Sequence, residues 1–217
     1  KKTIFEDDFM PIDFIDNQAI YGEFGQKNLK AAAAILLQSG FEKKQVFAAL
    51  KRVLPPKGRF QKVVYDASFD VIVDYAHTPD GLDVVLKEAK KQAMAVKSRV
   101  LVCFGCGGDR DRQKRALMAQ IASKWADVIV ITQDNPRTED PEAIIEDIMK
   151  GMDTNKKFFI EHDRKKAIQL IVSLAKKQDM VLIAGKGHET VQIIGDQHFP
   201  CDDYQLALGA LEGLVAS

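Results

Sequence analysis

Short apolar runs alternate with segments of helical periodicity from residue 62 to the end of the chain. Several runs are almost purely apolar, which is typical of strands that are buried on both faces of a parallel sheet. The segments between them repeat apolar residues every three or four positions, which favours amphipathic helices. The predicted strands are residues 62–65, 71–74, 99–104, 128–132, 157–160 and 180–184. The predicted helices are residues 79–96, 112–124, 141–152, 164–176 and 202–215.

This alternation predicts an α/β fold with a mainly parallel sheet and helices on both of its faces. Residues 190–194 and 198–199 flank Gly195 and Asp196, so they are predicted to form a terminal hairpin.

The first part of the chain follows a different pattern. Residues 28–38 are rich in Ala and Leu and predict a buried helix, and residues 42–53 predict an amphipathic one. Residues 1–20 are weakly patterned, consistent with a short strand or an edge piece. A Pro55-Pro56-Lys57-Gly58 sequence then interrupts the chain. We therefore predict two domains, residues 1–61 and 62–217.

The composition of the chain argues against several functional classes. The chain has 217 residues, of which 46% are hydrophobic, and its formal net charge is zero. The balanced charge gives no general argument for binding nucleic acid or an anionic membrane. No apolar run approaches membrane-spanning length, and the chain begins without the apolar core of a signal peptide. Three cysteines do not suggest a disulfide scaffold, so we expect a cytoplasmic protein.

Charged and glycine-rich loops follow four of the predicted strands. Their sequences are YAHTPDG, GCGGDRDRQKR, QDNPRTEDP and GKGHET. The carboxyl ends of parallel strands meet at one edge of a sheet, where open α/β proteins place their binding sites. The four loops together therefore predict an anion-handling site at that edge.

The first of these loops joins a strand to a helix. Thr78 is a plausible N-cap and Pro79 suits the first helical position. Asp74 and His77 would then lie at the end of the strand, within reach of a ligand. Taken alone, the pair is equally consistent with a capped turn whose His is satisfied by its neighbours.

The second loop contains Gly105-Cys106-Gly107-Gly108 but matches neither a dinucleotide fingerprint nor a Walker phosphate loop. Cys103 and Cys106 have C-x-x-C spacing, yet the chain has too few thiols for a four-cysteine zinc site, and we expect no metal or redox role. Arg110 either belongs to a solvated helix start or directs its guanidinium at a carboxylate.

The third and fourth loops carry opposite charges. Pro136 should hold Asn135 extended and present Asp134 and Arg137, a pair that suits a zwitterion, although a capped loop would explain the same residues. Gly185 to Glu189 gather two glycines, Lys186, His188 and Glu189, and glycines let backbone N–H groups approach an anion.

The motifs DYAHTPDGL, GCGGDRDRQKRALM, DNPRTEDP and GKGHE, in this order, resemble the Mur ligases. The resemblance implies that residues 1–61 are the C-terminal remnant of the central ATPase domain. It implies that residues 62–217 are the Rossmann-like C-terminal domain. The implied reaction is ATP-driven amide formation through an acyl phosphate, with ATP and Mg2+ as cofactors. The implied substrates are a UDP-MurNAc-dipeptide and, because of the DNPR motif, meso-diaminopimelate in peptidoglycan synthesis.

The resemblance also assigns roles to individual positions. It implies nucleotide contacts for Asn28, Arg59, Asp74 and His77. It implies an amino-acid pocket formed by Arg110, Asp134, Asn135, Pro136, Arg137, Gly185 and Glu189, supported by Lys186 and His188. Enzymes of this family that add L-lysine usually lack the Arg of the DNPR loop, which agrees with the zwitterion argument.

The sequence also departs from the family pattern. Gly25 stands where the family has its first Asn, and Phe60-Gln61 replace Met-Glu, both in the part of the pattern that contacts nucleotide. Gln113 and Ala116 replace a common Gly and Pro. The sequence contains no phosphate loop, so we expect no ligation by this chain alone. The alternatives are a stand-alone amino-acid-binding or regulatory module, an L-lysine-adding enzyme and a folylpolyglutamate-type relative.

Overall fold

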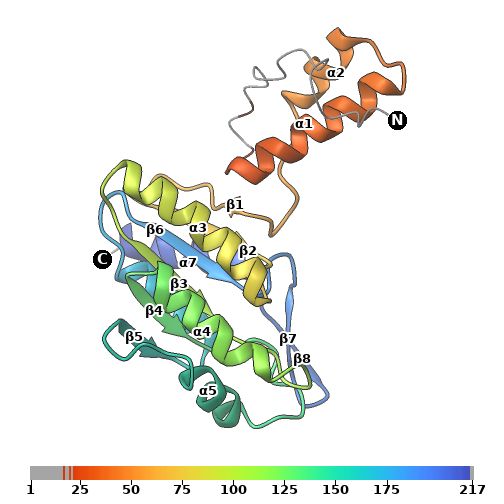
Figure 1. Cartoon of the computed structure of the whole chain (residues 1–217). Coiled ribbons are helices and arrows are strands. Elements are labelled where there is room, and N and C mark those ends of the chain that lie inside the picture. Colours follow the sequence, from red (N-terminus) through yellow and green to blue (C-terminus); the bar gives the residue numbers. More distant parts are fainter. Residues whose placement is uncertain (1–16, 18–19, 21, 216–217) are drawn as a thin grey trace. The chain divides into compact units, whose positions relative to one another are not determined.

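A computed structural model of the protein describes residue 17, residue 20 and residues 22–215 (Figure 1). The chain divides into two compact units, residues 1–56 and residues 57–217, which are described separately. Apart from Asn17 and Ile20, the strand or edge piece predicted within residues 1–20 lies outside the described residues.

Two helices form the described part of the first unit. Helix α1 spans Glu23–Gln38 and helix α2 spans Lys43–Leu50. With Gly22 as its N-cap, α1 begins at Glu23, five residues before the predicted position. The helices pack through Ile20, Leu29, Ala33, Val46 and Leu50, which form a small apolar core. The side-chain amide of Asn17 donates hydrogen bonds to the carbonyls of Leu50 (2.8 Å) and Val53 (2.8 Å), so it satisfies the end of α2, which is shorter than predicted.

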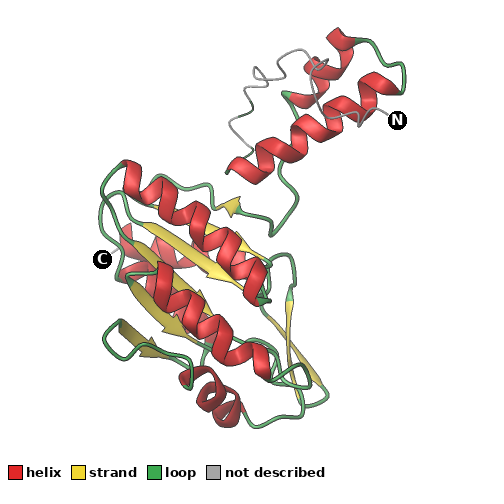
Figure 2. Cartoon of the chain, viewed as in Figure 1, coloured by secondary structure: helices red, strands yellow, loops and turns green. Residues whose placement is uncertain are grey.

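The second unit is built on a sheet whose described strands lie in the order β1-β2-β6-β3-β4-β5 (Figure 2). All neighbouring pairs are parallel except β1 with β2. The predicted mainly parallel α/β sheet is confirmed. The strands are β1 Gln61–Lys62, β2 Asp70–Asp74, β3 Val100–Phe104, β4 Val128–Ile131, β5 Lys157–Ile160 and β6 Met180–Ala184.

Helices cover both faces of this sheet. Helices α3 (Pro79–Ala95), α4 (Gln113–Trp125) and α5 (Pro141–Met149) lie side by side on one face (Figure 1). Helices α6 (Arg164–Ser173) and α7 (Asp203–Val215) pack together on the other. Alternate strand residues such as Val73, Cys103 and Ile183 face α6 and α7 in a buried cluster. The strands are therefore apolar on both sides, as their sequences predicted.

The strand β1 is shorter than the predicted residues 62–65. Val63 still donates a hydrogen bond to the carbonyl of Val71 (2.8 Å), but the N–H of Val64 turns to the hydroxyl of Tyr204 (3.2 Å). The chain thus leaves the sheet after Lys62. The predicted terminal hairpin is present, with β7 (Val191–Ile194) antiparallel to β8 (Gln197–Pro200).

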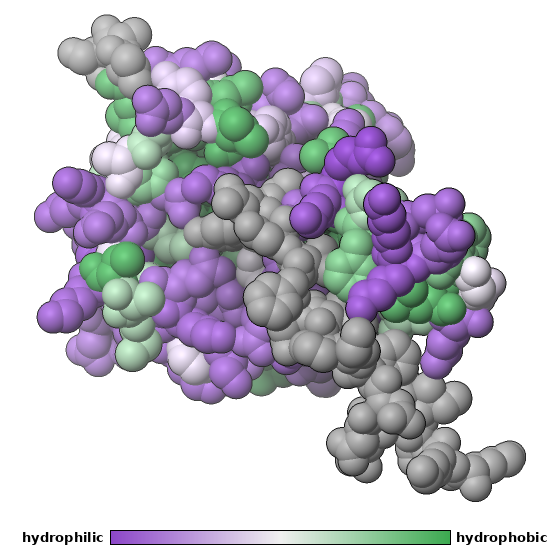
Figure 3. All heavy atoms as spheres, turned by 90° about the horizontal axis from the view of Figure 1, so that it is seen from above, coloured by the Kyte–Doolittle hydropathy of each residue, from purple (hydrophilic) through white to green (hydrophobic). Residues whose placement is uncertain are grey.

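The surface is mixed in character. Hydrophilic side chains predominate on the face seen in Figure 3, interrupted by separate hydrophobic patches. Exposed apolar residues come from different elements, including Ile35 of α1, Val84 of α3 and Leu117 of α4. Within the described part of the chain, every helix is too short or too polar to cross a membrane.

The register of the parallel strands brings their carboxyl ends level. Asp74 of β2 lies opposite Ala184 of β6, Cys103 of β3 opposite Ile183, and Phe104 opposite Ile131 of β4. The loops that follow these four strands therefore leave the same edge of the sheet, as predicted.

Candidate functional site

Three backbone segments make close contact at one end of this edge. A Cβ atom on Gly58 would lie 2.1 Å from the carbonyl carbon of Gly187, and one on Gly187 would lie 2.6 Å from the Cβ of Tyr75. Both glycines have positive φ (65° and 54°), which other residues rarely adopt. We call Gly58, Tyr75 and Gly187 the glycine junction. It joins the turn before β1 to the loops after β2 and β6.

The carboxylate of Asp74 supports the backbone on both sides of this junction. Its buried carboxylate accepts hydrogen bonds from the N–H groups of Phe60 (2.6 Å) and Ala76 (2.7 Å). Burial raises the pKa of Asp74, although these two bonds and the nearby charge of Arg59 oppose the change. The geometry gives Asp74 a positioning role, and its predicted contact with nucleotide stays a prediction.

Tyr75, which the sequence analysis did not single out, gathers three of the predicted residues around its ring. The guanidinium of Arg59 lies 4.8 Å from the ring centre, and the rings of His77 and His188 lie 4.6 and 5.1 Å from it. Arg59, His77 and His188 are exposed. Stacking on an aromatic face orients a cation without neutralising it.

Lys114 of α4 also reaches this group and donates a hydrogen bond to the carbonyl of His77 (2.9 Å). The last predicted nucleotide residue, Asn28, is exposed on α1 in the first unit.

A buried lysine organises the predicted amino-acid residues. The ammonium group of Lys186, which has no exposed surface, donates a hydrogen bond to Oδ1 of Asn135 (2.8 Å). The same group lies 3.2 Å from Oε2 of Glu189 and 3.7 Å from Oδ1 of Asp134. One buried cation is thus shared by two carboxylates, Asp134 and Glu189. We call these two carboxylates and Lys186 the acidic group.

Further contacts fix this acidic group. Burial would raise the pKa of Glu189, but a hydrogen bond from Asn135 (3.1 Å) and the charge of Lys186 outweigh it, so the pKa lies below its usual value. Gly185 allows close approach to Asp134, because a Cβ there would lie 2.8 Å from Oδ2. Pro136 is buried. Its carbonyl accepts a hydrogen bond from the N–H of Glu139 (3.1 Å).

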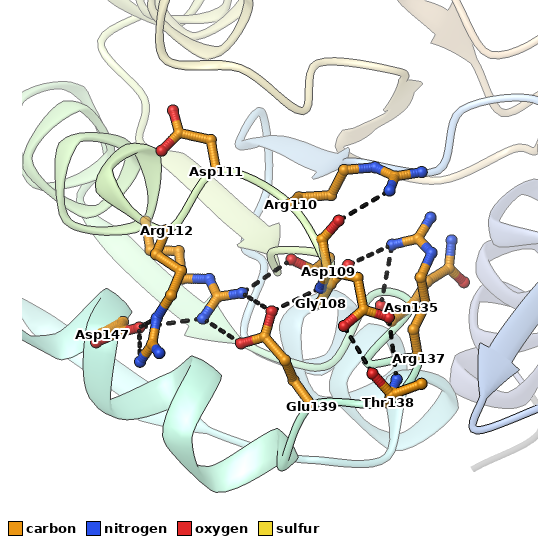
Figure 4. Close-up of polar contacts among 12 residues, drawn as sticks. Gly108, Asp109, Arg110, Asp111, Arg112, Asn135, Arg137, Thr138, Glu139 and Asp147 are labelled. Carbon is orange, nitrogen blue, oxygen red and sulfur yellow. Dashed lines mark hydrogen bonds and ion pairs between the residues drawn. The ribbon is translucent and has the colours of Figure 1, made fainter.

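Two arginines flank Gly107 beside the acidic group. Arg137 donates hydrogen bonds from Nη1 to the carbonyls of Gly108 (2.8 Å) and Asn135 (3.4 Å), and Arg110 donates from Nη1 to the carbonyl of Asp109 (2.9 Å). Both side chains come within 4 Å of the position that a Cβ of Gly107 would occupy. Figure 4 shows both guanidinium groups at the upper right of the residues drawn. Within the described residues, neither arginine forms an ion pair with a carboxylate, and neither directs its fork at one.

The sequence analysis missed two buried arginines that support this site. Arg164 pairs with Asp203 through two hydrogen bonds of 2.7 Å and donates to the carbonyls of Gln133 (3.2 Å) and Ala184 (3.1 Å). It therefore ties the ends of β4 and β6 together. Arg115 of α4 is also fully buried and contacts the loops after β3 and β4.

The site contains the groups needed to bind a charged molecule but gathers no metal ligands. The described residues include no group of three or more His, Cys, Asp or Glu that could hold an ion. Burial raises the pKa of Cys103 and of Cys106 to about 12, so both remain thiols at neutral pH.

Comparison with known proteins agrees with this arrangement. Residues 58–187 match the family described as Mur ligase, glutamate ligase domain. The UDP-N-acetylmuramoyl-L-alanyl-D-glutamate--2,6-diaminopimelate ligase of Syntrophomonas wolfei is 46% identical over 201 residues, which cover 92% of this chain and 40% of that protein. The enzyme of the same name from Geobacillus kaustophilus is 46% identical over 194 residues, covering 89% of this chain and 39% of that protein.

Solved structures give the same result. A structure of a ligase with the same name is 38% identical, has a TM-score of 0.70, and covers 90% of this chain and 40% of that one. E. coli FolC in complex with DHPP and ADP is 23% identical with a TM-score of 0.58, and it shares the fold, covering 88% of this chain and 39% of that one. The chain thus spans about two fifths of the length of the proteins it matches.

The resemblance read from the four loop motifs is confirmed by the matched region and by the extent of identity. The chain belongs to the Mur ligase family.

Proposed function

We propose that this chain provides the amino-acid-binding part of an ATP-dependent ligase that adds meso-diaminopimelate to UDP-MurNAc-L-Ala-D-Glu in peptidoglycan synthesis. The observation that carries the proposal is the pair of arginines, Arg110 and Arg137, which lack carboxylate partners within the described residues and lie beside the acidic group of Asp134 and Glu189. Relatives at 42–46% identity carry the name of this ligase.

The charges of the site match one zwitterionic end of the substrate. An ammonium group is accepted by the carboxylates of Asp134 and Glu189, which lie beside Lys186. A carboxylate is bound by the guanidinium groups of Arg110 and Arg137, which present planar, forked donors suited to it. L-Lysine has the same spacing between its two amino groups but lacks the second carboxylate, so it would leave one of these interactions unmade.

The glycine junction supports a proposed nucleotide side of the site. Arg59, His77 and Asp74 lie within one group around Tyr75, and we propose that this group meets the phosphates and ribose of ATP. A nucleotide contact for Asn28 of α1 stays a separate prediction. E. coli FolC, which shares this fold, is known in complex with ADP. We also propose that residues 1–61 belong to the central ATPase domain.

In the proposed reaction, a substrate carboxylate attacks the γ-phosphate of ATP, and ADP leaves. The amine of diaminopimelate then attacks the acyl carbon, loses a proton and displaces inorganic phosphate. Mg2+ would neutralise the phosphates, but no described residue of this chain is assigned to it, because no suitable group of ligands gathers. The three cysteines are free, which supports the proposed cytoplasmic location.

The proposal is tested by titrating the chain calorimetrically with meso-diaminopimelate and with L-lysine, and by repeating both titrations with Arg137→Ala. We expect the wild-type chain to prefer diaminopimelate. The variant should lose about 2–4 kcal/mol of binding to diaminopimelate, because an ion pair with a desolvated partner is removed, and little of its binding to lysine. Arg112→Ala is the matched control, since Arg112 is exposed and its side chain pairs with Asp147 instead.

Equal affinity for the two amino acids would contradict the role given to the second carboxylate. If neither binds, the same comparison can be made in a full-length ligase, with this chain replacing the corresponding part of the Geobacillus kaustophilus enzyme. A chimaera that ligates lysine as well as diaminopimelate would overturn the substrate assignment.

A further inference from the structure

Two loops that carry the substrate-binding arginines are fastened to each other by their own polar contacts. They are residues 105–111, which precede α4, and residues 132–140, between β4 and α5. The N–H of Gly108 donates to the carbonyl of Asn135 (2.9 Å), and Thr138 donates to Asp109 from its hydroxyl (2.8 Å) and its N–H (3.3 Å). We call these two loops, together with Arg115 and Asp147, the arginine clasp (Figure 4).

Arg115 and Glu139 form the centre of this clasp. The buried guanidinium of Arg115 donates to both carboxylate oxygens of Glu139 (2.8 and 2.9 Å), in the bidentate arrangement that is strongest for this pair. Nη2 of Arg115 also reaches the carbonyl of Gly107 (3.2 Å). Oε1 of Glu139 in turn accepts the N–H of Asp109 (2.6 Å). The ion pair of Arg115 and Glu139 is therefore hydrogen-bonded to the backbone of both residue 107 and residue 109.

The backbone of the same short segment also accepts hydrogen bonds from the two substrate-binding arginines. The carbonyl of Asp109 accepts the hydrogen bond from Arg110, and the carbonyl of Gly108 accepts the one from Arg137. Any movement of residues 107–109 would therefore move both guanidinium groups. The ion pair of Arg115 and Glu139 is connected to them through one shared piece of backbone.

The backbone of the clasp is held in an unfavourable conformation. Asp109 and Arg137 have positive φ values, 54° and 53°, although neither is glycine. Such conformations cost free energy and persist only where surrounding contacts enforce them, and they are common at binding sites. At Asp109 the enforcing contacts are those of Thr138 and Glu139. At Arg137 they are backbone hydrogen bonds with Ile193 (3.1 Å) and Gly195 (2.7 Å).

We propose that Arg115 and Glu139 are positioning residues that set the spacing of Arg110 and Arg137 and thereby the preference for an amino acid with a second carboxylate. This inference rests on the proposed function. Arg115 and Glu139 do not contact the substrate, because Arg115 is buried beneath the loops and its charge is already matched by Glu139 and Asp147. The hydrogen bonds from Arg115 lower the pKa of Glu139, so this partner stays ionised at neutral pH.

The first test needs no ligand. In Glu139→Ala, nuclear magnetic resonance should show exchange of the Asp109 amide proton faster by on the order of tenfold, together with increased motion of the Nε–H group of Arg137. Glu139→Gln keeps the shape and one acceptor, so it should recover part of the wild-type values. Arg112→Ala is the control, because it removes an ion pair from Asp147 but no contact to residues 107–109. Unchanged Asp109 exchange and Arg137 motion in Glu139→Ala would overturn the inference.

The second test measures selectivity. Glu139→Ala should lower the ratio of affinities for meso-diaminopimelate and L-lysine by on the order of tenfold, leaving the affinity for lysine close to that of the wild type. An equal loss of both affinities would show a merely structural role and overturn the inference. If the wild-type chain shows no preference, the substrate assignment fails by itself, and the ligand-independent measurement still decides whether Glu139 holds the two arginines.

Discussion

The glycine junction and the arginine clasp both join neighbouring loops at the same edge of the sheet, but the carboxylates of Asp74 and Asp147, which support them, are stabilised differently. Asp74, which supports the junction, accepts hydrogen bonds from the backbone N–H groups of Phe60 and Ala76, and burial raises its pKa. Asp147 in the clasp lies against Lys150, Arg112 and Arg115, and the hydrogen bond from Lys150 is the largest influence that lowers its pKa. One region depends on backbone fit, and the other depends on paired charge.

This difference suits what each region presents to a ligand. The junction leaves Arg59 and His77 stacked on Tyr75 and free of carboxylates among the described residues. In the clasp, the buried Arg115 pairs with the carboxylates of Glu139 and Asp147. Arg110 and Arg137 donate only to backbone carbonyls among the described residues, so their guanidinium groups remain available to a ligand. In both regions the supporting contacts are separate from the cations that we assign to ligand binding. A supporting side chain can therefore be removed while every cation that we assign to ligand binding is still present.

The largest expected effect comes from removing the link between the two regions. Asp203→Ala would leave the buried guanidinium of Arg164 unpaired between the ends of β4 and β6. We expect a loss of about 3–5 kcal/mol in the free energy of unfolding. Urea unfolding can be followed by the fluorescence of Trp125, the only tryptophan of the sequence, which lies in α4.

Asp202→Ala provides the matched control for this change. The neighbouring carboxylate of Asp202 accepts hydrogen bonds from the N–H groups of Tyr204 (2.9 Å) and Gln205 (3.1 Å) at the start of α7. Its loss should cost only about 1 kcal/mol, as for other helix caps. Equal costs for the two variants would mean that the buried ion pair does not join the two regions.

A smaller effect is expected from disturbing the junction alone. Gly58→Ala would force a Cβ to within 2.1 Å of backbone atoms of Gly187 and His188, at a φ of 65° that disfavours alanine. The clash and the strained conformation together should cost about 2–4 kcal/mol of unfolding free energy. Salt should not change this cost, because no charge is involved.

Gly195→Ala separates the two contributions. Gly195 has a similar φ of 58°, but a Cβ there would meet no atom within 4 Å. Its cost should be limited to the conformational part, about 1–2 kcal/mol. If Gly58→Ala costs no more than Gly195→Ala, close backbone contact is not what holds the junction together.

The sequence was informative where strands and loops are local features. The apolar runs predicted the parallel sheet, and the loops after β2, β3, β4 and β6 were correctly expected at one edge. Lys186 was expected only to support the site, yet it lies at the centre of the acidic group. Its sequence neighbours gave no sign of this, because its contacts with Asn135 and Asp134 come from a loop about fifty residues away.

The buried arginines had a sequence signal that went unused. Arg115 stands three, four and seven residues before Met118, Ala119 and Ala122, which are buried on the same face of α4. Arg164 has the same spacing to Ala167, Ile168 and Ile171 on α6. A charged residue at the start of an apolar stripe indicates a buried cation. Its partners could not be predicted, since Glu139 and Asp203 lie 24 and 39 residues further along the chain.

The smallest expected effect is a difference in how the carboxylates of the two regions make stability depend on pH. The hydrogen bond that Glu139 accepts from Arg115 is the main reason why the pKa of Glu139 is lowered in the folded chain. Ionised Glu139 therefore stabilises the fold fully above the unfolded pKa, which is near 4.3. This stabilisation is lost as the pH falls through the folded pKa. The raised pKa of Asp74 has the opposite sign, and its contribution is lost as the pH rises through the folded value. Glu139→Gln should therefore remove on the order of 1 kcal/mol at neutral pH and less below pH 4.

Carbon-13 titration of the two carboxyl groups by nuclear magnetic resonance measures this difference directly. The midpoint of Asp74 should lie above the usual value for aspartate, and that of Glu139 below the usual value for glutamate. In Glu139→Gln the Asp74 midpoint should not move, because the groups that shift its pKa are Phe60, Ala76 and Arg59, which lie outside the clasp. Midpoints displaced in the same direction would show that the junction and the clasp share one electrostatic environment, and that the separation of backbone fit from paired charge is wrong.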